Sequence, residues 1–223
     1  NTAFPRPPDW KPAAPLTLVE SYVFGDTEEV ADQLGNPVDV AVNSKQEVYI
    51  LDRGFTSIWV YGQEGSSLAR FGSEGDGPGD MSRPLCIAVD PRDRVYVAGD
   101  GGMITVYEAD GTPVKIIKRK NVGVPVRSIR VDDSYIYTCC IDVLEQTVIH
   151  KYDKNTGDYI TSFGDSYAKG KDIDTRVERV FGGGFIDLNS DGQLYFCQMD
   201  PLEVRIYERS GGQIRKPAVY QEL

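Results

Sequence analysis

Histidine is the scarcest functional residue of this chain: among 223 residues there is one, His150. A three-histidine zinc site and acid/base catalysis by paired histidines both need more imidazoles than that. The sequence also has no G-x-S-x-G elbow, so a Ser/His/Asp hydrolase would have to recruit His150 from within a predicted strand. We expect this imidazole to be packed or on the surface. The sequence therefore predicts a protein that is not an enzyme and uses neither a cofactor nor a metal ion.

Basic charge and long apolar runs are also scarce. Acidic residues number 34 and basic residues 24, which gives a formal net charge of -10. Such a field repels phosphate backbones, so nucleic acid is not an expected partner. No run approaches the roughly 20 apolar residues that span a bilayer, so we expect no membrane span in this chain. Other protein subunits are the partners that these absences leave.

The four cysteines form no C-x-x-C pair and lie in apolar, strand-like runs. This placement favours buried thiols over a metal site. Cys139 and Cys140 are neighbours, so on a strand their side chains should point to opposite faces. A disulfide among the four stays open at this point.

Glycine, proline and tyrosine are plentiful, with 23, 13 and 13 residues. They favour short strands joined by tight turns, and so an all-β protein. Five prolines fall in residues 1–15, which read as an extended arm. Because such a spacer often follows a removed signal or a membrane anchor, and the chain begins at Asn1, we expect an exported protein, periplasmic or on the cell surface. A membrane tether before the arm is the alternative to a removed signal.

A fourfold repeat decides the predicted fold. Four segments align, and in each a second strand carries a tyrosine and a third strand ends on another: Tyr49 and Tyr61, Tyr96 and Tyr107, Tyr137 and Tyr152, Tyr195 and Tyr207. Subtraction spaces the second series 46, 45 and 55 residues apart, about the length of a four-stranded propeller blade. We predict an all-β β-propeller with antiparallel blades at about 37–72, 84–118, 125–164 and 183–220.

The repeat resembles the NHL-repeat β-propeller family. The resemblance rests on a G-x-x-G-x-G-P-G loop from Gly72 to Gly79, an "AVD" strand, a "VYV" strand and the run "ITVYEADG". It is similar in particular to bacterial six-bladed propellers, which implies a six-bladed ring. Residues 16–25 match the fourth strand of a blade that is otherwise missing, so residues 16–223 would hold four blades plus one orphan strand. We expect about two further blades after Leu223 in the natural protein, or another chain over the open edges; a closed four-bladed ring is the alternative.

The innermost strands of a propeller point alternate residues into its central channel. Aligning them places Ala41, Ala88, Arg130 and Asp187 at one position, and Asp39, Cys86, Ser128 and Phe185 two residues earlier. Asp39, Arg130 and Asp187 are therefore the channel-lining candidates. Arg130 and Asp187 would anchor a ligand or, in the interpretation that we favour, form an ion pair in a wet channel.

Two further features are candidate contact sites. One aspartate follows each second strand, and the four are Asp52, Asp100, Asp142 and Asp200. Together they would offer oxygen ligands to a cation, but each more simply accepts backbone N–H bonds in a turn. The long loop at 164–183, with a short helix expected within 174–181, is a candidate contact surface.

The function that these features favour is a non-enzymatic, protein-binding scaffold, such as an accessory subunit on the outer face of a membrane complex. The alternative is a propeller that binds or hydrolyses a small molecule or sugar with a cation in the channel.

Overall fold

The structure is a computed structural model that describes residues 33–100, 102–120, 125–172, 174, 183–198 and 203–219, with the backbone alone for 213–219. Its regular structure within these residues is entirely β, which confirms the predicted fold class. The arm at 1–15, the orphan strand at 16–25 and, apart from residue 174, the short helix expected within 174–181 lie outside the described residues. In the described part, no helix is long and apolar enough to cross a bilayer.

Four antiparallel meanders follow one another along the chain, and each is one blade. Blade one comprises β1 (Pro37–Val42), β2 (Val48–Asp52), β3 (Ser57–Tyr61) and β4 (Ser67–Phe71). Blade two comprises β7 (Pro84–Val89), β8 (Val95–Gly99), β9 (Met103–Tyr107) and β10 (Pro113–Lys118). Blade three comprises β11 (Ser128–Val131), β12 (Tyr135–Asp142), β13 (Thr147–Asp153) and β14 (Tyr159–Asp165). Blade four comprises β15 (Gly184–Leu188), β16 (Leu194–Gln198), β17 (Glu203–Tyr207) and β18 (Gln213–Val219).

The glycine-rich stretch after blade one is an inter-blade loop. Within it, β5 (Ser73–Glu74) pairs in parallel with β6 (Asp80–Met81). The hydroxyl of Tyr107 donates a hydrogen bond of 2.9 Å to the carbonyl oxygen of Gly79 and so ties the loop to blade two.

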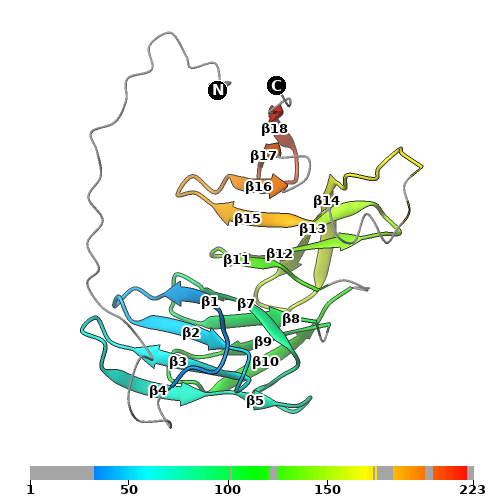
Figure 1. The fold of residues 1–223 in the computed structure, drawn as a ribbon. Helices are drawn as coiled ribbons and strands as arrows, with labels where there is room; N and C mark the ends of the chain where they lie inside the picture. Colours follow the sequence, from blue (N-terminus) through cyan, green and yellow to red (C-terminus); the bar gives the residue numbers. More distant parts are fainter. Residues whose placement is uncertain are drawn as a thin grey trace, which may run out of the picture.

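The innermost strands β1, β7, β11 and β15 pack side by side in that order, so that the blades succeed one another as in a propeller (Figure 1). An apolar cluster fills each of the three gaps between them. Tyr49 and Tyr107 lie between blades one and two, Tyr96 and Tyr152 between two and three, and Tyr137 and Tyr207 between three and four. Burial of an aromatic side chain is among the largest apolar contributions to folding stability. The regular spacing of these tyrosines in the sequence therefore reflects the blade interfaces that they fill.

The residue that follows the first strand of each blade is polar, namely Asn43, Asp90, Asp132 and Asn189, and the two aspartates form ion pairs across a blade interface. In blade two, Asp90 Oδ1 accepts the backbone N–H groups of Arg92 and Arg94, at 2.8 and 3.0 Å. Its Oδ2 accepts the Tyr96 hydroxyl at 3.1 Å and lies 3.0 Å from Nζ of Lys154, which belongs to blade three. This ion pair is buried at the blade interface.

The other interfaces vary that arrangement. Between blades three and four, Nε of Arg209 lies 3.4 Å from Asp132 Oδ2. Between blades one and two the positions hold Asn43 and Ala109, and the Tyr49 hydroxyl donates instead to the carbonyl oxygen of Ala109 at 3.2 Å. An aspartate thus occurs where the next blade supplies a cation, and an asparagine where it supplies an alanine.

The predicted buried thiols are confirmed for three of the four cysteines. Cys139 packs between blades three and four and Cys140 between blades two and three, so the neighbours do point to opposite faces. Cys86 is buried, Cys197 is partly exposed, and all four are free. His150 is a packed imidazole, 1% exposed, with Nδ1 2.7 Å from Ser162 Oγ and Nε2 2.9 Å from the carbonyl oxygen of Cys140.

Candidate functional site at the mouth of the central channel

The strand register supports the alignment of the four first strands. Ala41, Ala88, Arg130 and Asp187 each pair with the second-strand tyrosine of their own blade. Asp39, Cys86, Ser128 and Phe185 each pair with the residue two positions after it. The four blades therefore place these residues at equivalent positions of their innermost strands, although Cys86 and Ala88 pack in the apolar cluster between blades two and three.

Arg130 and Asp187 form the ion pair that the alignment favours. Nε of Arg130 lies 2.8 Å from Oδ1 of Asp187, and the two side chains are 37% and 73% exposed. Water reaches both groups, so the pair contributes little to stability.

Asp39, the third channel candidate, connects blades one and two. Its Oδ1 accepts the N–H of Val40 and its Oδ2 the N–H of Ile87, both at 2.9 Å. Two backbone donors thus already engage this carboxylate, one on each oxygen.

The rim aspartates do not act as one group. Asp52 is fully buried and accepts four backbone N–H bonds, from Gly35, Asn36, Gly54 and Phe55. Asp142 accepts those of Leu144 and Glu145. These two have the turn role that the sequence favours. Asp100 differs, because its Oδ2 lies 3.4 Å from Nη1 of Arg83, and Asp200 lies outside the described residues.

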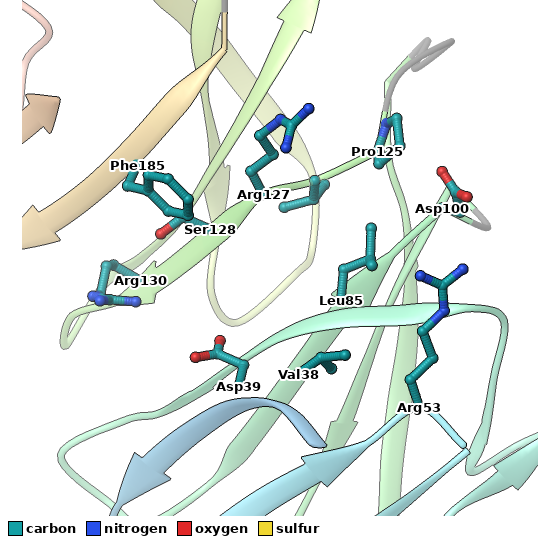
Figure 2. A pocket seen from close by; sticks show the side chains of 11 residues that line it. Val38, Asp39, Arg53, Leu85, Asp100, Pro125, Arg127, Ser128, Arg130 and Phe185 are labelled. Atoms are coloured by element: carbon teal, nitrogen blue, oxygen red, sulfur yellow. The ribbon is translucent and has the colours of Figure 1, made fainter. Parts of the chain in front are cut away.

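A cavity of about 450 Å³ opens where the innermost strands begin (Figure 2). Blades one to four all contribute to its wall. The lining residues are Val38, Asp39, Arg53, Leu85, Asp100, Pro125, Val126, Arg127, Ser128, Arg130 and Phe185. We call this cavity the mouth pocket. A second cavity of about 320 Å³, lined mainly by aliphatic residues, lies further along the same strands and shares Arg130 with it.

The mouth pocket contains two arginines that sequence reasoning missed, Arg53 and Arg127. Both are exposed, and within the described chain neither guanidinium has a carboxylate or carbonyl partner. The predicted hairpin of the first two strands could have indicated Arg53, because it brings the end of the second strand beside the start of the first. The pairing of Pro37 with Asp52 shows this arrangement. Arg53 follows that aspartate, and Arg127 directly precedes β11.

The chemistry that this lining supports is recognition of an anion. Arginine presents planar N–H donors that match the two oxygens of a carboxylate. The nearby thiol of Cys86 is 1% exposed, and burial raises its pKa, so it is no thiolate nucleophile. No group of three or more histidine, cysteine, aspartate or glutamate residues in the described ranges could hold a metal ion.

Comparisons with known proteins identify the fold alone. No protein-family model and no curated protein matches the sequence. Among solved structures, the chain is similar to hydrazine synthase of Kuenenia stuttgartiensis, with a TM-score of 0.63 and 15% identity over 90% of this chain and 53% of that one. It is also similar to U3-55K, with 0.62 and 13% over 80% and 51%, and to a catalytically inactive virginiamycin B lyase of Staphylococcus aureus with quinupristin, with 0.62 and 16% over 87% and 59%. The chain thus spans about half the length of these proteins, and its fold is that of a β-propeller.

Proposed function

We propose that this protein is a non-enzymatic binding propeller that presents the mouth pocket to another protein subunit. The observation that carries the proposal is a pair of guanidinium groups, those of Arg53 and Arg127, that have no carboxylate or carbonyl partner among the described residues and lie at a concave site built by four blades. Concave sites with an apolar wall and a few convergent polar groups are the usual places for ligands.

The blade architecture supports a scaffolding role. The interfaces are fixed by buried tyrosines and, between blades two and three, by the buried Asp90–Lys154 pair. Such interfaces hold the loops around the mouth pocket in place, and a preorganised surface loses less entropy on binding. His150 and three cysteines are committed to packing, which leaves them little part in chemistry at the pocket.

The same proposal extends to place and family. We propose that the chain is a β-propeller of the NHL-repeat type that is exported from the cytoplasm. In this proposal it serves as an accessory subunit on the outer face of a membrane complex. Its support is the proline-rich arm at 1–15, the Gly72–Gly79 loop and the repeated blade motifs.

Gentle cross-linking of the native protein followed by mass spectrometry tests this function. We expect reproducible cross-links from residues around the mouth pocket to one or a few other subunits. A protein that is recovered alone after cross-linking, at every detergent concentration tried, would refute the scaffold.

The alternative, a sugar or small molecule bound with a cation, has a direct test as well. In the structure the three described rim aspartates are engaged separately, Asp52 and Asp142 by turn N–H groups and Asp100 by Arg83. We therefore expect no change of melting temperature on adding calcium, whereas a saturable rise would favour the cation-dependent alternative.

A further inference from the structure

We propose that the mouth pocket takes an acidic peptide segment, with carboxylates on Arg53 and Arg127 and apolar side chains on the wall between them. This inference rests on the proposed function and specifies the chemistry of the partner.

The charge distribution is the first argument. The whole chain carries a net charge of -10, yet the mouth pocket has three arginines and two aspartates in its wall. A positive site on an acidic protein attracts a negative group locally, while the surrounding field disfavours polyanions that would spread beyond the pocket. A short acidic segment fits this pattern better than a nucleic acid.

The two carboxylates that line the pocket form no ion pair with Arg53 or Arg127. Asp39 accepts two backbone N–H bonds, and Asp100 faces Arg83. The third arginine, Arg130, is paired with Asp187. Among the arginines that line the pocket, Arg53 and Arg127 are therefore the two that no described carboxylate engages, so their charges are available to a ligand.

The backbone around both arginines is fixed. Four N–H bonds to Asp52 hold the turn from which Arg53 projects. The N–H of Arg127 donates to the carbonyl oxygen of Cys139 at 2.9 Å, at the point where β11 begins. Figure 2 shows both side chains at the pocket, projecting from different blades. Binding then orders only the side chains, which lowers its entropic cost.

The apolar part of the wall selects a carboxylate on an apolar body over a free phosphate. Val38, Leu85 and Phe185 line the same pocket as the charged groups, and Phe185 is 49% exposed. Phosphate sites are typically built from converging backbone N–H groups, whereas an apolar wall gains free energy only by covering apolar side chains. A peptide that alternates acidic and aliphatic residues satisfies both parts.

A defined peptide pair tests the inference by calorimetry. The probe is a blocked five-residue peptide in which leucine and glutamate alternate, and its control has glutamine in place of glutamate. We expect the glutamate peptide to bind at least about tenfold more tightly, which is about 1.4 kcal/mol, because a hydrogen bond to a charged carboxylate is stronger than one to a neutral amide. Arg53→Gln and Arg127→Gln should each weaken binding about tenfold or more.

Arg92→Gln is the matched control, because Arg92 is an exposed arginine beyond the far end of β7 and should leave binding unchanged. Equal affinities for the two peptides, or equal losses in Arg92→Gln and Arg127→Gln, would overturn the inference. Displacement of the peptide by equimolar inorganic phosphate would overturn the selection of carboxylates. If the peptide fails to bind while native cross-links persist, only the acidic ligand is wrong; if both fail, the scaffold is wrong too.

Discussion

The buried ion pair between blades two and three offers a quantitative test of how the blades are held together. Asp90 and Lys154 have side chains 0% and 5% exposed, and their charged atoms are 3.0 Å apart. Removing one partner leaves the other charge buried, which typically costs about 3–5 kcal/mol of unfolding free energy. We expect Lys154→Ala and Asp90→Asn each to lose that amount.

The double variant Asp90→Asn/Lys154→Ala should lose far less than the sum of the single changes. It recreates the pair found between blades one and two, where Asn43 and Ala109 occupy the equivalent positions. Asparagine keeps the turn, because Asn43 Oδ1 accepts the N–H groups of Lys45 and Glu47 much as Asp90 accepts those of its own turn. The coupling energy in this cycle should reach about 3 kcal/mol.

Urea denaturation followed by circular dichroism measures these differences, with the slope compared across the variants. The control is Glu108→Gln, which breaks a surface ion pair between Arg94 and Glu108, whose side chains are 40% and 43% exposed, respectively. This change should lower the free energy of unfolding by less than about 1 kcal/mol. Additive single changes, or losses no larger than that of the control, would refute the assignment of a structural role to the buried pair.

Three further predictions concern single residues. Burial lowers the pKa of His150, so between that lowered pKa and about 6.5 only the unfolded chain binds the proton. The free energy of unfolding should therefore fall as the pH falls through this range, by at most about 1.4 kcal/mol per pH unit. Denaturation of His150→Gln at pH 7 and pH 5.5 should lack this part of the pH dependence. Burial raises the pKa of the Cys139 thiol, so iodoacetamide should alkylate Cys197 well before Cys139 in the folded protein, and mass spectrometry that finds the reverse order would contradict the packing. Gly65 and Gly111 occupy the same turn in blades one and two, with φ of +79° and +87°, so alanine at either position should lower the free energy of unfolding by about 1–2 kcal/mol. Gly111→Ala should lower it more, because the new Cβ would lie 2.5 Å from a phenyl ring of the preceding blade, whereas no atom lies within 4 Å of a Cβ at Gly65. Equal melting temperatures of the two variants would contradict this.

The repeat made the fold predictable, since tyrosines at blade spacing can only be buried by stacking equivalent sheets. The same alignment predicted the facing charges of Arg130 and Asp187, because side-chain direction alternates along a strand. It also predicted the turn role that Asp52 shows.

The polar contacts at the blade interfaces and the mouth pocket are harder to predict, because they bring together residues from different strands of different blades. Lys154 meets Asp90 across 64 residues, and only the stacking of two blades brings them together. Asp100 follows its strand as Asp52 does, but Arg83 is near enough to pair with it. The repeat alignment predicts a role for the aspartate before Arg53 but none for Arg53 itself.

The mouth pocket as a docking site is tested most directly by site-specific photo-cross-linking in the native host. A photoreactive residue at Phe185, 49% exposed at the pocket, is compared with one at Ile160, 45% exposed on the outer strand β14. We expect a discrete cross-linked product at an acidic segment of another protein from position 185 alone, and its loss when Arg53→Gln and Arg127→Gln are combined. The same product from position 160, or its persistence in the double arginine variant, would contradict the account.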